Sequence, residues 1–148
     1  MSKAITIATA MTAHLNAVPA LAGVEAIVDR QLEIATEIEK RVFLTMGKAK
    51  GKGAMITVFY SGFENPTASA ANAPVVTRNY LVSIYAAPVM STGNTPADDL
   101  MESAAAALHL WEPAEANGIA EIHVSGGEAR PDDDYLIYDL TVKIKSRL

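Results

Sequence analysis

The stretch "DYLIYDLTVKIK", residues 134–145, has the clearest two-residue alternation in the chain. Its apolar side chains fall on one set of alternate positions, namely Leu136, Tyr138, Leu140, Val142 and Ile144. The intervening positions are mostly polar. Because successive side chains of a strand point to opposite faces, the stretch predicts a β-strand with one face on a core and the other toward solvent or a partner.

Other segments supply strands to pair with it. "AMITVFYSG", residues 54–62, is rich in β-branched and aromatic side chains and almost continuously apolar, which indicates an interior strand. "VVTRNYLVSIYAAP", residues 75–88, predicts a second long strand. Shorter strands are expected in residues 23–30, where the alternation is partial, and in residues 118–127. Together these segments predict one sheet.

The first segment that could cover the sheet lies at the start of the chain. In residues 3–17 apolar side chains recur at helical spacing, and Pro19 follows where a helix commonly stops. The same region resembles a signal peptide, with Lys3, a mostly apolar stretch and the tripeptide at residues 20–22. His14 and Asn16 interrupt the apolar stretch, which favours an amphipathic helix packed on a core.

The second covering segment is "TPADDLMESAAAALHLWEP", residues 95–113. Thr95 is expected to be the N-cap and Pro96 the first helical residue, with two acidic residues in the first turn. One helical face carries Leu100, Ala104, Ala107, Leu108 and Trp111. Trp111 is therefore expected to anchor the end of a helix that packs on the sheet.

Residues 31–45 fit a helical stripe and also a strand alternation, and we interpret them as a short helix. The order of elements predicts a single α+β domain over residues 1–148. Its sheet is expected to be largely antiparallel or mixed, with two main helices packed on one face.

Composition excludes several classes of function. The net charge of −5 argues against a surface that wraps nucleic acid, and no apolar run approaches the length of a membrane helix. The absence of Cys excludes disulfides, thiolate metal sites and Cys nucleophiles. No metal or other cofactor is expected.

Two polar segments are candidates for mobile loops. "GKAKGKG", residues 47–53, places lysines between glycines, but its spacing does not match a phosphate-binding loop, so a solvated turn is favoured. "FENPTASAANAPVV", residues 63–76, is a long connection with little apolar surface to offset the entropy of ordering it. Either segment could become ordered against a partner.

Motifs of catalysis are not found. The chain has no G-x-S-x-G, H-E-x-x-H or dinucleotide fingerprint. His109 has no second His three or four residues away, and the acids at 132–134 lack the spacing of a calcium loop. We therefore expect a protein that is not an enzyme.

One resemblance suggests a role. The segment Leu108, His109, Leu110, Trp111 and then Pro113 follows a Tyr-Leu-Val-Ser-Ile-Tyr strand and a Thr-Pro-Ala-Asp-Asp start. In this, and in its order of elements, the chain resembles the bacteriophage tail terminator or tail completion family of minor tail proteins, which includes the tail terminator of phage lambda. The similarity is strongest over residues 54–145.

The resemblance implies a structural protein that forms a ring, commonly a hexamer, on the end of the phage or prophage tail tube. The implied partners are further copies of the chain, the tail tube protein and the head–tail connector protein, with neither a membrane nor a specific nucleic acid, although DNA would pass through the ring. The implied location is the cytoplasm of the bacterial host and then the virion tail. Candidate partner contacts are Lys48, Lys50, Lys52, Asn65, Asn72 and Arg78.

Two other functions stay open. A small-ligand-binding or enzymatic α+β domain would need a pocket with convergent polar groups, for which His123 with Asp139 or Tyr138 is a candidate. A secreted adaptor would require removal of the first 22 residues.

Overall fold

The computed structural model describes residues 2–30, 34–43, 53–64, 75–87, 96–113, 122–130, 132 and 135–147. Within these ranges the elements are α1 (Lys3–Asn16), β1 (Glu25–Asp29), α2 (Ile34–Ile38), β2 (Ala54–Glu64), β3 (Val75–Ala86), α3 (Ala97–Leu108), β4 (Ile122–Arg130) and β5 (Leu136–Arg147). A 3-10 turn, Pro19–Leu21, follows α1, and a π-helical stretch, Glu39–Phe43, continues α2.

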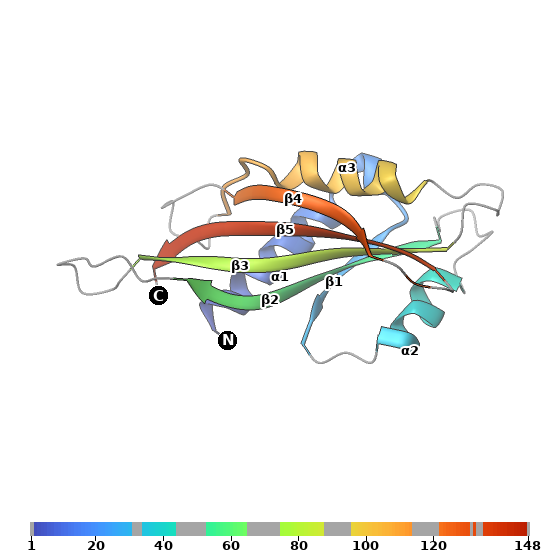
Figure 1. The fold of residues 1–148 in the computed structure, drawn as a ribbon, viewed down its shortest axis with the longest axis horizontal. Helices are drawn as coiled ribbons and strands as arrows, with labels where there is room; N and C mark the ends of the chain where they lie inside the picture. The colour runs from blue at the N-terminus through green and yellow to red at the C-terminus, as the bar shows by residue number, and fades with distance from the viewer. Residues whose placement is uncertain are drawn as a thin grey trace.

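The described strands form one mixed sheet in the order β1-β2-β3-β5-β4 (Figure 1). β1 runs parallel to β2, and the remaining neighbours are antiparallel. β5, which includes residues 136–145 of the alternating stretch, therefore lies inside the sheet between β3 and β4. The predicted α+β class and the mixed, largely antiparallel sheet are confirmed.

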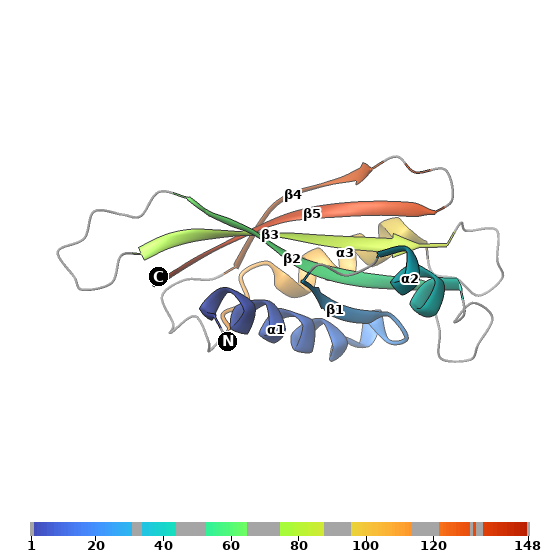
Figure 2. The ribbon, with the colours of Figure 1, turned by 90° about the horizontal axis from the view of Figure 1, so that it is seen from below.

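α1 and α3 cover the same face of the sheet (Figures 1 and 2). α1 lies over β1 and β2, whereas α3 lies over β3, β5 and β4, and the two helices touch. Fully buried side chains of both helices meet the alternate apolar residues of the strands, among them Ile7, Met11, Leu15, Leu100, Leu108, Ile56, Val82, Leu140 and Val142. We call this side the covered face.

The alternation in residues 134–145 predicted the covered face of β5 with one exception. Leu136, expected on the core, is 38% exposed, while its neighbour Ile137 is 4% exposed. Ile137 lies on the opposite face, where α2 and the π-helical stretch contribute Ile38 and Val42 to a second apolar cluster with Met55 and Tyr85. The helix interpreted in residues 31–45 thus packs on one end of the other face.

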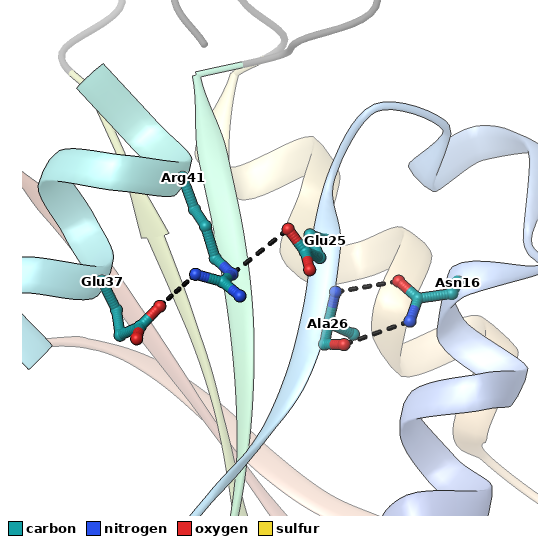
Figure 3. A network of polar contacts seen from close by, with 5 residues as sticks. All are labelled: Asn16, Glu25, Ala26, Glu37 and Arg41. Carbon is teal, nitrogen blue, oxygen red and sulfur yellow. Dashed lines mark hydrogen bonds and ion pairs between the residues drawn. The ribbon is translucent and has the colours of Figure 1, made fainter. Parts of the chain in front are cut away.

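Figure 3 shows how polar contacts tie β1 to its surroundings. The Asn16 side chain accepts a hydrogen bond from the Ala26 N–H (2.8 Å) and donates one to the Ala26 carbonyl (3.1 Å). Arg41 forms ion pairs with Glu37 and, at 3.1 Å, with Glu25. Asn16 therefore pairs with the outward-facing N–H and carbonyl of Ala26 on the edge strand β1, and Arg41 links the π-helical stretch after α2 to the same strand.

Both ends of α3 differ from the prediction. Pro96 has ψ 140 and its carbonyl accepts from the Leu100 N–H, so Pro96 is the N-cap and Ala97 the first helical residue. Thr95, the expected cap, lies outside the described residues. The helix ends at Leu108, because His109 is extended and Leu110 has a positive φ of 65. Trp111 therefore lies beyond the helix.

Trp111 still acts as an anchor, but through α1. Its ring stacks on the His14 imidazole with centroids 4.0 Å apart and planes 6° from parallel. The Nε2 of His14 lies 2.9 Å from the Ala107 carbonyl, which is in the last turn of α3 and has no partner within the helix. Since a carbonyl only accepts, Nε2 carries the proton, and His14 joins the two helices.

A buried tyrosine gives the fold a testable pH dependence. Tyr80 is 1% exposed and its hydroxyl donates to the Ala4 carbonyl (2.7 Å). Burial raises the pKa of Tyr80 above its usual value, and nearby Arg78 opposes this only in part. Above pH 10 or so the unfolded chain loses this proton while the folded chain keeps it, so stability should fall by up to about 1.4 kcal/mol per pH unit.

We expect Tyr80→Phe to reduce the slope of unfolding free energy against pH between about pH 10 and 12 by about one proton. At neutral pH the variant should lose about 1 kcal/mol, because the Ala4 carbonyl loses its donor. Urea unfolding across this pH range measures both quantities. Equal alkaline slopes in the two proteins would show that Tyr80 titrates normally.

Two adjacent glycines of β4 provide a matched pair of substitutions. A Cβ added at Gly127 would lie 2.7 Å from Cδ2 of buried Leu140 and 3.2 Å from Sδ of Met101, whereas one added at Gly126 meets nothing within 4 Å. We expect Gly127→Ala to destabilise the fold by about 1 to 2 kcal/mol and Gly126→Ala to change it by about 0.5 kcal/mol or less. Equal effects in thermal unfolding would contradict this packing.

Candidate functional site

The described elements cover only part of the face opposite α1 and α3. α2 and the π-helical stretch pack over one end of it, and beyond them the strands carry a hollow of about 310 Å³. The hollow is lined by Asp29, Thr57, Phe59, Leu81, Ser83, Tyr85, Arg130 and Asp139. We call these residues the open face. All five described strands contribute to it, β4 only through Arg130 at its end.

Strand register explains why these side chains meet. Thr57 lies opposite Ser83 and Ser83 opposite Asp139, so three polar residues form a row across β2, β3 and β5. In the next row Phe59 lies opposite Leu81. Phe59 is 42% exposed, which makes it one of the few large apolar side chains that the described part of the fold leaves in water. The open face therefore combines a polar row with an exposed apolar row.

Asp139, at the β5 end of the polar row, makes most of the row's side-chain contacts. Its Oδ1 accepts from the Ser83 hydroxyl at 2.7 Å, and its carboxylate forms a two-point ion pair with Arg130, at 2.9 Å to Oδ2 and 3.3 Å to Oδ1. The Arg130 guanidinium also donates to the Tyr85 hydroxyl (3.3 Å) and lies 5.8 Å from that ring's centroid. The carboxylate is thus committed to contacts between strands and is poorly placed to act as a general base.

The environment of Arg130 favours its charged form. Partial burial alone would lower the pKa of Arg130, but hydrogen bonds to Asp139 and Tyr85 and the charge of Asp139 outweigh it, and the pKa is raised. The Arg130 side chain is 45% exposed and that of Asp139 15%. A fixed cation therefore stands at the rim of the open face, above a more buried carboxylate.

Arg78, a candidate partner contact, is only 5% exposed. Its Nε donates to the Ser146 hydroxyl (2.7 Å), and its Nη1 donates to the Tyr60 hydroxyl (3.2 Å). Arg78 and Tyr80 are two residues apart in β3, so their side chains lie on the same side of the sheet, the covered face. In the single chain its guanidinium is therefore part of the interior. Lys48, Lys50, Lys52, Asn65 and Asn72 lie outside the described residues.

The pocket imagined from sequence, with His123 next to Asp139 or Tyr138, does not form. His123 lies opposite Lys143, whereas Asp139 lies opposite Glu128 and Tyr138 opposite Ala129, several residues along the same pair of strands. His123 instead lies beside His109, with ring centroids 5.8 Å apart. The Nδ1 of His109 accepts a weak hydrogen bond from the Val124 N–H (3.2 Å), so this imidazole caps the edge of β4.

Sequence reasoning missed Ser83, Arg130 and Asp139 as a group. The alternation in β5 marked Asp139 only as a polar-face residue. Its partners lie 56 residues away for Ser83 and nine for Arg130. An Asp flanked by apolar residues in a long interior strand was the one available signal, because such a carboxylate requires a partner.

Metal ligands, membrane-spanning helices and similarity to known proteins were the remaining features of interest. Among the residues described here, no set of three or more His, Cys, Asp or Glu side chains is arranged to hold a metal ion. None of the described helices is long and apolar enough to cross a bilayer. Comparison of the sequence with models of known protein families and with curated proteins gives no match.

Proposed function

We propose that this chain is a non-catalytic structural protein of phage or prophage tails, which caps the tail tube as a ring and joins it to the head connector. The observation that supports it best is the asymmetry of the sheet: two helices pack on one face, and on the other face the described residues leave Phe59 and Leu81 accessible beside charged residues. An apolar patch with a polar rim is typical of a protein contact.

A ring requires a heterologous contact, in which two different surfaces of the same chain meet. The open face supplies one such surface. Its apolar row would be buried, and the rim residues Asp29 and Arg130 would set the orientation of the neighbour. The resemblance in residues 54–145 includes β2, β3 and β5, which build most of this face.

Mass in solution tests the proposal. We expect light scattering to give rings of about six copies, or a monomer that forms them as concentration rises, with ring-shaped particles in electron micrographs of the same sample. Purified tail tubes of the matching phage should bind the ring at their ends. A monomer at every concentration that also fails to bind tubes would refute the proposal.

Phe59→Lys connects this test to the open face. Because Phe59 is 42% exposed, the substitution should leave the unfolding free energy nearly unchanged while abolishing the ring. Ala106→Lys, at an exposed position on α3, is the matched control and should assemble normally. Equal assembly of the two variants would show that the ring uses another surface.

A small-ligand-binding or enzymatic domain is the second candidate function. The hollow of about 310 Å³ favours it, since its volume suits a small molecule and Thr57, Ser83 and Arg130 offer polar groups around it. A ligand there should raise the melting temperature of the native chain but not that of Leu81→Trp, which fills the hollow. If no compound in a broad thermal-shift screen separates the two proteins, this candidate fails.

A further inference from the structure

The outer edge of β4 is capped over its first half. The Ile122 N–H donates to the Trp111 carbonyl (3.0 Å), and the Ile122 carbonyl accepts from the Leu110 N–H (2.7 Å). The Val124 N–H is taken by His109. Both residues therefore direct backbone groups away from β5, as alternate residues of an edge strand do.

The second half of the edge has the same geometry, but none of the described segments caps it. A bulge between Val124 and Gly126 inserts one residue into β4. Beyond it, Gly127 lies opposite Leu140 and Ala129 opposite Tyr138. These two β5 residues belong to the same alternate set of positions as Ile144 and Val142, which lie opposite Ile122 and Val124. Gly127 and Ala129 thus direct their N–H and C=O groups outward. Within the described residues, no hydrogen bond joins these groups to another segment.

Charges beside this edge are unevenly matched. Glu128 and Asp139 lie directly opposite each other on adjacent strands, and Arg130 is bound to Asp139. Glu128 is exposed and has no ion-pair partner among the described residues. Two acids facing each other on neighbouring strands are unfavourable, so a cation placed opposite Glu128 from outside would stabilise the edge.

We propose that a second copy of this chain supplies that cation, by antiparallel pairing of the two β4 strands about a two-fold axis at Ala129. In this register Ala129 faces its own copy and forms the hydrogen-bonded pair, since its N–H and C=O groups point outward. Glu128 of each copy then faces Arg130 of the other. The contact is self-complementary in charge as well as in backbone geometry.

The helix above the edge is compatible with this pairing. Met101 of α3 lies over Gly127, and Met101 and Ala105 are partly buried on the side of α3 near β4. Two-fold pairing brings these small and flexible apolar side chains of the two copies toward each other above the joined sheet. The bulge before Gly126 and the proline at 131 limit the pairing to a short segment, so the contact is weak and concentration-dependent.

An isologous contact closes with two copies and does not build a ring. The inference therefore goes beyond the proposed tail function and does not depend on it. A dimer through β4 and a ring through the open face use different strand surfaces that share Arg130, and a particle with both contacts would join two rings.

Cysteine cross-linking tests the register, because the chain has no Cys of its own. Directly opposed residues of a hydrogen-bonded pair have Cα atoms about 5.5 Å apart, within reach of a disulfide. We expect Ala129→Cys to form a covalent dimer under mild oxidation at least tenfold faster than Ala13→Cys, an exposed alanine on α1. Equal rates for the two variants would overturn the proposal. Equal rates are also the result expected if the edge binds a strand of another protein instead of a second copy.

A charge variant tests the same contact without cysteine. Glu128→Arg places like charges opposite each other and should remove the dimer that sedimentation detects for the native chain between about 10 and 500 µM, without affecting any ring that forms through the open face. Glu112→Arg, at another exposed position, should still dimerise. If the native chain forms rings but Ala129→Cys forms no covalent dimer, this contact is refuted and the tail proposal stands. If Ala129→Cys forms the dimer but the native chain forms no rings, the β4 contact is supported and the tail proposal is not.

Discussion

Replacing Arg78 with Ala is expected to lower the free energy of unfolding by about 2 to 4 kcal/mol, which is large for a position that its charge marks as a surface residue. The side chain is 5% exposed, so the substitution leaves a cavity under β2 and β5. It also removes the donors that bind the hydroxyls of Ser146 and Tyr60. Urea unfolding followed by Trp111 fluorescence measures the loss.

Two further variants separate volume from charge. Arg78→Met keeps most of the stem and should recover part of the loss, while Arg78→Lys keeps the cation but cannot reproduce the fork of donors. Arg130→Ala is the matched control, because that side chain is 45% exposed, and should cost about 1 kcal/mol or less. Equal losses at Arg78 and Arg130 would contradict the buried role assigned to Arg78.

Leu108→Ala is expected to destabilise the protein by about 3 kcal/mol. Leu108 is the last residue of α3, is 0% exposed and belongs to the main core cluster. Its loss would loosen the end of α3 that His14 and Trp111 hold against α1. We expect a lower melting temperature in calorimetry and a change in the emission of Trp111, the only Trp in the chain.

Leu110→Ala is the control two residues later. Leu110 is 53% exposed and has a φ of 65, which Ala would also have to adopt, so this substitution should change the unfolding free energy by about 0.5 kcal/mol or less. The same chemical change thus tests burial alone. If the two alanine variants lost equal stability, the packing of α3 on the sheet would be wrong.

Local patterns in the sequence predicted much of the fold. Alternation in residues 134–145 identified β5 and most of its buried side chains, and helical spacing in residues 3–17 identified α1. These predictions succeeded because periodicity reports which side chains share a face. The ends of α3 were less accessible, since a pattern of apolar residues continues past Leu108 although the backbone does not.

The candidate site could not be predicted in the same way. Asp139 and Ser83 are 56 residues apart, and Arg78 and Ser146 are 68 apart. Such pairs form only when strands align in one register, and a shift of one residue would send each side chain to the other face. Arg78 appeared to be a surface cation because charge alone says nothing about which face of a sheet a residue occupies.

By itself the sequence determined the class of the fold, the faces that α1, α3 and β5 bury, and the absence of thiol chemistry, because composition and periodicity are local properties. Only the tertiary structure decided that Arg78 is interior. It also decided that the described helices leave one sheet face open around Asp139, and that the described residues cap the β4 edge as far as Val124 but not at Gly127 and Ala129. The reason is physical: register and edge pairing depend on contacts between distant segments, and their energies exist only once the sheet has formed.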